Sequence, residues 1–337
     1  MKKYIFFFAL VFAGIILFAE NNVINELMRI SEIKDDTERL FQYDKFVMSL
    51  QTPEFGESIV YDAGGVKFAL IYAPGSEFPF GEKNDSFKKV ENNFFIGESE
   101  VTYELWYKVK LWATDKERGD NFYTFSEDGL EGSFSGGGSW PNYNNIGKEP
   151  TSNSKHPVTN LNYKDVIVWL NALSEYLGFN PVYFYDGKVI RSAVNDNVII
   201  NAYADYNSDG FRLPTEYEWE LAAKYSGAGS DGYRWMMGNY VSGADGLTQK
   251  EISEVAVYSA NSDYHTSEVK SLKPNVLGLY DMGGNAWEWC FSDDKSTNRI
   301  LRGGAFDSPD MFLKSSYRYS TYFKTRYNSF GFRIVKK

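Results

Sequence analysis

The sequence predicts an α+β domain that is rich in loops and contains few helices. Two observations lead to this prediction. Short apolar runs of strand type occur beside only three well-marked helices, and long stretches rich in Gly, Ser and Asn connect them. No internal repeat of solenoid length is present. We therefore expect a mixed fold rather than a repeat protein.

Two strands are expected in the first part of the domain. The apolar run 66–72 ends at the turn sequence Ala73-Pro74-Gly75, and the aromatic-rich run 94–100 follows it. The stretch 115–150, by contrast, is rich in Gly, Ser and Asn and predicts a long loop. Loops of that length in compact domains are usually binding elements or mobile insertions.

Three helices are predicted from their start signals and apolar periodicity. Thr102 precedes a helix over 103–113, and a second, amphipathic helix is expected over 163–177. Thr215 precedes a third helix over 216–225, with a glutamate at the third helical position. That spacing predicts a capping box.

The N-terminus is typical of an exported protein. A basic start is followed by an apolar run over 4–18 and by Ala19, so we expect a signal peptide over 1–19. An uncleaved anchor is the alternative, although the run is short for a membrane span. We expect residues 20–60 to form a helical N-terminal segment and residues 61–337 to form the domain. The expected location is the cell surface, the periplasm or the medium.

Composition excludes some classes of partner. The chain is 43% hydrophobic and 18% aromatic, which allows a substantial core, and its net charge is −10. A phosphate-binding face needs a basic excess, so no nucleic-acid partner is expected. Cys290 is the only cysteine, so the domain has neither an internal disulfide nor a thiolate cluster for a metal.

Seven motifs occur in the order known from one protein family. They are Phe95-Ile96-Gly97 with Glu100-Val101-Thr102, His156-Pro157-Val158 with Asn160, Gly210-Phe211-Arg212-Leu213-Pro214-Thr215-Glu216 with Glu218-Trp219-Glu220, Pro274-Asn275 with Gly278-Leu279-Tyr280-Asp281-Met282, Gly284-Asn285-Ala286-Trp287-Glu288-Trp289, Leu301-Arg302-Gly303-Gly304, and Gly331-Phe332-Arg333. The chain thus resembles the formylglycine-generating sulfatase-modifying (FGE-sulfatase) family over about 66–335. The resemblance implies that family's variant of the C-type lectin fold.

The resemblance also implies a structural calcium ion held by Asp281, Gly284, Ala286 and Glu288. Two carboxylates and the carbonyls of small residues on a tight turn are ligands that a hard cation accepts. In the alternative interpretation, Asp281 and Glu288 instead satisfy buried backbone donors and arginines.

Buried ion pairs and a tryptophan pair are expected in the core. Arginines in glycine-containing motifs near strand ends are interpreted as ties to carboxylates. The arginines are Arg212, Arg302 and Arg333, with Glu216, Glu218 and Glu288 among the candidate partners. Trp287 and Trp289 have the strand period of two and should point together into the core.

The resemblance does not extend to catalysis. The family's oxidase holds copper(I) on two cysteine thiolates between the Arg-Gly-Gly and final Gly-Phe-Arg motifs. Here that interval, 305–330, contains no cysteine, and Ser316 stands at one of those positions. A serine hydroxyl is a poor ligand for this soft ion, so no copper is expected. A related branch of the family uses three histidines for iron, whereas this chain has only His156 and His265. We therefore expect no enzyme and no catalytic residue.

The interval 305–330 instead has the composition of a binding surface. Tyrosines stand among small polar residues, as in antibody paratopes, where the ring supplies contact area at low cost in entropy. The residues expected to contact the ligand are Asp307, Ser308, Asp310, Tyr317, Tyr319, Tyr322, Phe323, Tyr327 and Asn328.

A second resemblance supports this interpretation. From the tryptophan motif to the end, the chain resembles the variable region of proteins diversified by retroelements, the treponemal variable proteins among them. The expected function is therefore exported, non-catalytic recognition of a protein or other macromolecule at the cell surface. An ordinary aromatic-rich terminus, a protein-modifying oxidase and a carbohydrate-binding module remain the alternatives.

Overall fold

The structure is a computed structural model that describes residues 28–34, 39, 53–135, 145–230, 232–292 and 294–337. The chain divides into two compact units, Met1–Glu54 and Phe55–Lys337. In the first unit, residues 28–31 are helical and Ile30 is buried. The predicted signal peptide over 1–19 lies outside the described residues. Among the helices that the structure describes, none has the length and apolarity to span a membrane.

The largest sheet of the second unit joins the start of the domain to the end of the chain. Its strand order is β1-β2-β5-β18-β11, and β18 lies antiparallel to β5, with the buried Val335 opposite the buried Ile96. Its strands are β1 (Ser58–Ala63), β2 (Val66–Ala73), β5 (Phe94–Gly97), β18 (Val335–Lys336) and β11 (Phe211–Arg212).

Strand β5 is shorter than the sequence predicted. It ends at Gly97 rather than at residue 100, because the backbone turns there and a Cβ on Gly97 would lie 2.9 Å from the carbonyl oxygen of Ser99. The turn carries Glu100 into the interior, where its side chain is buried.

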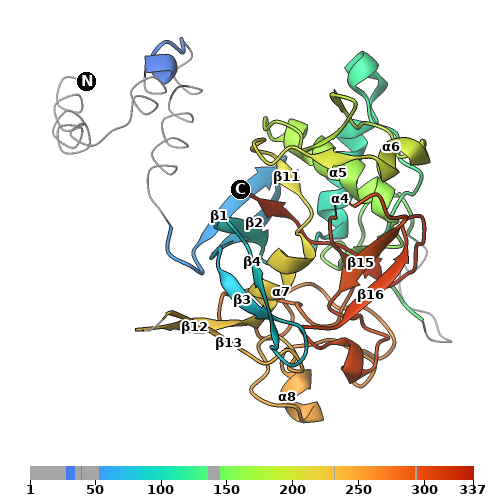
Figure 1. The fold of residues 1–337 in the computed structure, drawn as a ribbon. Coiled ribbons are helices and arrows are strands. Elements are labelled where there is room, and N and C mark those ends of the chain that lie inside the picture. The colour runs from blue at the N-terminus through green and yellow to red at the C-terminus, as the bar shows by residue number, and fades with distance from the viewer. Residues whose placement is uncertain (1–27, 35–38, 40–52, 136–144, 231, 293) are drawn as a thin grey trace, which may run out of the picture. The chain divides into compact units, whose positions relative to one another are not determined.

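A four-stranded sheet contains the interval 305–330. Its order is β16-β15-β14-β17, with β14 parallel to β17 and antiparallel to β15. In Figure 1, β15 and β16 lie side by side as two red strands. The four strands are β14 (Trp287–Trp289), β15 (Asn298–Arg302), β16 (Arg318–Tyr322) and β17 (Phe330–Gly331).

The remaining strands of the described residues form four smaller sheets. The sheets are β10-β8-β9, β12-β13, β3-β4 and β6-β7. Their strands are β3 (Glu77–Phe80), β4 (Ser86–Lys89), β6 (Leu130–Glu131), β7 (Val158–Thr159), β8 (Tyr183–Tyr185), β9 (Lys188–Val189), β10 (Tyr203–Ala204), β12 (Tyr225–Gly229) and β13 (Gly232–Trp235). The predicted long loop over 115–150 thus contains β6, and its residues 136–144 lie outside the described part.

The three predicted helices are present, the first and third with their predicted caps. Thr102 and Asn162 cap the first two through their side chains, and Thr215 forms a capping box with Glu218. The helices of the domain are α4 (Tyr103–Ala113), α5 (Tyr163–Tyr176), α6 (Asp196–Ile200), α7 (Glu216–Lys224), α8 (Gln249–Ser253) and the 3-10 turns η1 (Lys116–Asn121) and η2 (Asp310–Phe312). Figure 1 shows α4 and α5 together at one end of the domain and α8 at the other.

The main core lies between α4, α5 and the sheets. Trp106 of α4 stacks on Trp169 of α5, with ring centroids 5.5 Å apart, and Phe332 meets both rings edge-on. Trp289 is fully buried and Trp287 is 7% exposed, so the predicted inward orientation of this pair is confirmed.

Candidate functional site

A hollow of about 340 Å³ opens on the face of the C-terminal sheet that carries Trp287. Most of its wall is aromatic, and the sheet and the chain segments around it supply the lining. The lining residues are Trp287, Asp307, Ser308, Pro309, Phe312, Tyr317, Tyr319, Tyr327, Ser329 and Phe330. We call this feature the aromatic hollow.

The rings of the aromatic hollow contact one another. The Trp287 ring lies 6.0 Å from that of Tyr317 and 5.7 Å from that of Tyr319, measured between centroids. Phe330 connects Tyr319, at 6.3 Å, with Tyr327, at 5.1 Å. Tyr319 and Tyr327 are 38% and 55% exposed, whereas Trp287 and Phe330 are buried. The buried rings therefore form a floor, and the exposed tyrosines stand on it.

Strand β16 divides the predicted ligand residues between two faces. Side chains alternate along a strand, so Tyr319 and Tyr322, three residues apart, point to opposite sides. Tyr319 faces the hollow, while the Tyr322 ring lies under the ammonium of Lys324 at 5.8 Å. The prediction that both rings belong to one surface is therefore wrong.

Phe323 and Ser308 are less exposed than the sequence prediction implied. Phe323 is 1% exposed and belongs to the main core, because the chain leaves β16 there and its carbonyl accepts the N–H of Tyr163 at the start of α5. Ser308 is 4% exposed, and its hydroxyl accepts the N–H of Ala305 at 3.0 Å. The Ser308 side chain thus stabilises the backbone at the wall of the hollow.

The remaining predicted residues lie in or beside the hollow. Asp307 lines it, Asp310 is exposed at the start of η2, and Asn328 is half-buried. The Asn328 amide donates to the carbonyl of Phe134, 3.4 Å away. Partial burial raises the pKa of the Asp307 carboxyl.

Three aromatic residues of the hollow were not predicted as site residues. Trp287 was interpreted only as core, and Phe312 and Phe330 were passed over as apolar members of the segment. The parallel pairing of β14 with β17 brings Trp287 opposite Phe330. No local pattern in the sequence predicts that these two strands pair, because they are far apart in the chain.

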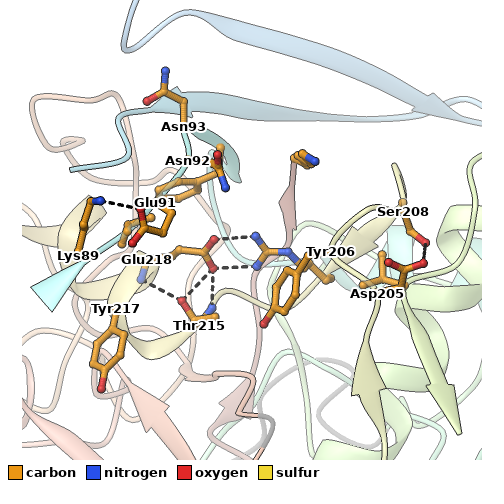
Figure 2. Close-up of a pocket in the computed structure, with 16 residues that line it drawn as sticks. Lys89, Glu91, Asn92, Asn93, Asp205, Tyr206, Ser208, Thr215, Tyr217 and Glu218 are labelled. Atoms are coloured by element: carbon orange, nitrogen blue, oxygen red, sulfur yellow. Dashed lines mark hydrogen bonds and ion pairs between the residues drawn. The ribbon is translucent and has the colours of Figure 1, made fainter. Parts of the chain in front are cut away.

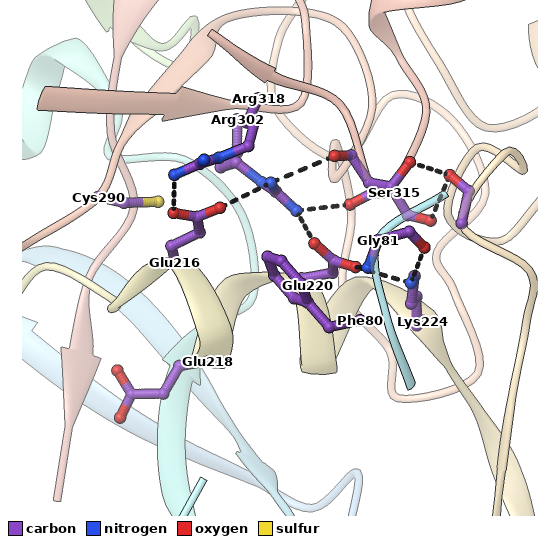
Figure 3. A network of polar contacts seen from close by, with 12 residues as sticks. Phe80, Gly81, Glu216, Glu218, Glu220, Lys224, Cys290, Arg302, Ser315 and Arg318 are labelled. Atoms are coloured by element: carbon purple, nitrogen blue, oxygen red, sulfur yellow. Dashed lines mark hydrogen bonds and ion pairs between the residues drawn. The ribbon is translucent and has the colours of Figure 1, made fainter. Parts of the chain in front are cut away.

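A buried ion network holds the segment that enters β16. The guanidinium of Arg302 donates to the carbonyls of Ser315, at 2.8 Å, and Ser316, at 3.4 Å, and pairs with Glu220 of α7. Arg302, Glu220 and Lys224 each have side chains 0% exposed. Figure 3 shows Glu220 between the two cations. The frame beneath the hollow is thus fixed by charge-assisted hydrogen bonds.

The other predicted arginine ties are present as well. Arg212 pairs with Glu218 through two contacts of 2.7 and 2.6 Å, and Arg333 pairs with Glu288. Figure 2 shows Glu218 beside Thr215, at the wall of a second, polar hollow of about 260 Å³ that Arg212 also lines. Glu218 therefore closes the capping box of α7 and neutralises a buried guanidinium at once.

The turn predicted to hold calcium is occupied by internal contacts. Asp281 accepts the N–H of Lys270 at 2.8 Å. Both oxygens of Glu288 accept from Arg333 at 2.6 Å, and one also accepts the indole N–H of Trp219 at 2.6 Å. Burial raises the pKa of Asp281 to about 6.

The backbone N–H groups of the small residues in this turn also have partners. The N–H of Gly284 donates to the carbonyl of Gly303, and that of Ala286 donates to the Glu100 carboxylate. Across the described part of the chain, no group of three or more His, Cys, Asp or Glu is placed to hold a metal. The two carboxylates accept buried donors, as the alternative interpretation describes. Calcium at this turn stays a prediction.

No thiol is available beside the hollow. Ser316, at a position of the family's catalytic cysteines by resemblance, donates its hydroxyl to the carbonyl of Gly238 at 2.7 Å. Cys290 is 1% exposed, and burial raises the pKa of its thiol well above the ordinary value. It is a packing residue, because a buried protonated thiol is a poor nucleophile and metal ligand.

Several known proteins are similar to this chain in sequence. Residues 51–337 match the family model of the sulfatase-modifying factor enzyme 1-like domain. Chaperone protein LppX of Paenibacillus barcinonensis is 28% identical over 268 residues, which are 74% of this chain and 82% of that protein. Inactive C-alpha-formylglycine-generating enzyme 2 of Bos taurus is 37% identical over 103 residues, 29% of this chain and 33% of its own length.

A solved structure shows the same architecture over most of the chain. The structure of Treponema denticola variable protein 1 superposes with a TM-score of 0.63 at 28% identity, covering 85% of this chain and 99% of that one. The predicted fold class is thereby confirmed: an α+β domain with the C-type-lectin-like fold of the formylglycine-generating-enzyme type, rich in loops. Because the family model matches most of its length, this chain belongs to the sulfatase-modifying factor enzyme 1-like family.

Proposed function

We propose that this protein is a non-catalytic receptor-type protein that binds a protein or other macromolecular ligand through the aromatic hollow. The observation that carries the proposal is the set of exposed tyrosine rings on a buried aromatic floor, above an ion network that fixes the chain entering β16. Rigid aromatic contact area is what gives binding surfaces affinity at low entropic cost.

The likeness to a variable protein supports this proposal. Treponema denticola variable protein 1 shares the fold over 85% of this chain. The interval 305–330 contributes most of the lining of the hollow, which is where a diversified segment would change what is bound. We therefore infer that this interval is a variable region. A near-copy of its coding segment beside a reverse-transcriptase gene is expected in the genome, and a locus without both would contradict the inference.

Binding is tested with a phage-displayed random peptide library panned against the full chain. We expect clones that bind the protein and lose at least about tenfold in affinity when Tyr319 and Tyr327 are both replaced by alanine. Tyr322→Ala is the matched control, because it removes an exposed ring of the same strand from the other face. Clones that bind all three proteins equally would contradict the proposal.

The non-catalytic part of the proposal has its own test. We expect no aldehyde when the protein is incubated with copper and a cysteine-containing sulfatase peptide, because interval 305–330 contains no cysteine and the Ser316 hydroxyl is bonded to Gly238. Mass spectrometry detects the loss of the thiol. Turnover of the peptide would show that the chain is an oxidase.

Export completes the proposal. It is supported by the basic and apolar pattern of residues 1–19, and it places the binding domain at the cell surface, in the periplasm or in the medium. Cell fractionation followed by N-terminal sequencing tests it. Recovery of the intact chain from the cytoplasm alone would contradict it.

A further inference from the structure

The lining of the aromatic hollow contains an acidic residue but no basic one. Six of its members are aromatic, Asp307 is the only acidic residue, and no member is basic. An aromatic face carries negative electrostatic potential, and a carboxylate adds a full negative charge. The hollow is therefore a negatively polarised space with apolar walls.

The Asp307 carboxylate is not neutralised by the basic residues of its own segment. Lys314 pairs with Glu82 at 2.7 Å, and Arg318 pairs with Glu216 at 2.6 Å. Within the described residues, no ion pair to Asp307 is present. Among the described residues, the only hydrogen bond to the Asp307 carboxylate comes from the backbone N–H of Asp307 itself. The charge thus remains available to a ligand.

We propose that the aromatic hollow receives a cationic side chain, lysine or arginine, from a protein partner. The alkyl stem packs on Trp287 and Phe330, the cationic end lies over the rings of Tyr319 and Tyr327, and Asp307 completes the charge pairing. The inference rests on the proposed function, because it names the chemistry that the same hollow selects.

The charge of the whole chain agrees with this choice. A net charge of −10 favours encounter with basic partners and disfavours acidic ones. A cation among aromatic rings is bound by the ring quadrupoles more strongly than a neutral side chain of the same size. Neutral or acidic ligands would leave the Asp307 charge unpaired.

The test uses peptides selected on the hollow by their dependence on Tyr319 and Tyr327. We expect each to contain a lysine or arginine whose replacement, by norleucine for lysine or citrulline for arginine, weakens binding to the native protein about tenfold. On the Asp307→Asn variant the same replacement should weaken binding only about twofold, since the charge partner is gone. Asparagine has nearly the shape of aspartate, and an unchanged Tm verifies the fold of the variant.

The outcomes separate the two levels of the proposal. Peptides that need Tyr319 and Tyr327 but tolerate both the neutral replacement and Asp307→Asn would overturn the cationic ligand and leave the binding function intact. A library that yields no peptide dependent on the two tyrosines would overturn the binding function and this inference with it.

Discussion

His156 is a buried imidazole in the motif that precedes β7. Its Nδ1 lies 3.0 Å from the hydroxyl oxygen of Thr266, and the residue is 7% exposed. Burial, with a smaller contribution from the charge of His265, lowers its pKa from 6.5 to about 4. The unfolded chain therefore takes up a proton before the folded one does. The stability that depends on neutral His156 is complete above pH 6.5 and is lost as the pH falls towards 4.

We expect a fall in pH to destabilise the native protein more than it destabilises the His156→Gln variant. Between pH 7 and pH 5 the free energy of unfolding of the native protein should fall by about 2 kcal/mol more than that of the variant. Urea unfolding at the two pH values measures this difference. Equal losses would show that the pKa of His156 is the same in the folded and the unfolded chain.

Neighbouring residues of β16 show what the sequence could not reveal about the site. Composition correctly marked the interval 305–330 as unusual, and Asp307, Tyr317, Tyr319 and Tyr327 do line one hollow. Composition does not say which face of a strand a ring occupies. The register of β16 against β15 decides that, and it depends on pairing between distant residues.

Among the secondary-structure elements, helix α7 holds the ion network together through Glu220. Glu220 accepts from Arg302 of β15 and from Lys224 on its own helix, and its other contact is the backbone N–H of Gly81. Removing its charge leaves two buried cations without their shared partner. Such a change is costly because the cations cannot reach water.

Two substitutions in this network should therefore differ sharply. We expect Glu220→Gln to lower the free energy of unfolding by about 3 kcal/mol. Arg318→Ala should lower it by less than about 1 kcal/mol, because the Arg318 side chain is 55% exposed and its pairing with Glu216 is screened by water. Chemical denaturation of both variants gives the comparison. Similar losses would contradict a buried, unscreened network.

The elements themselves were predictable where their signals are local. The helices α4, α5 and α7 follow from a capping side chain and an apolar period, both contained in about fifteen residues. Helix α8 was missed because it spans only five residues, although Thr248 and Glu251 form a capping box. The pairing of β18 with β5 was not predicted, since no local signal connects them.

At the scale of the whole molecule, the core holds together through aromatic packing and buried ion pairs. Glu288 is engaged by Arg333 and Trp219, and Asp281 by the backbone of Lys270. These contacts give both carboxylates hydrogen-bond partners from the protein itself. The fold is therefore expected to be complete without calcium.

Chelation tests this expectation. We expect the same Tm, within about 2 °C, in excess EGTA and in millimolar calcium, because no stability is gained from a ligand that does not bind the folded state. Differential scanning calorimetry supplies the measurement. A Tm that rises with calcium concentration would establish a calcium site and contradict the contacts described here.

Binding at the aromatic hollow is the central claim, and hydrogen exchange on a complex tests it most directly. With a bound peptide selected by panning, amides of 306–330 that line the hollow should exchange more slowly. Those around the polar hollow of Arg212 and Glu218 should be unchanged. Protection confined to the polar hollow, with none at β16 or its flanking segments, would contradict the account.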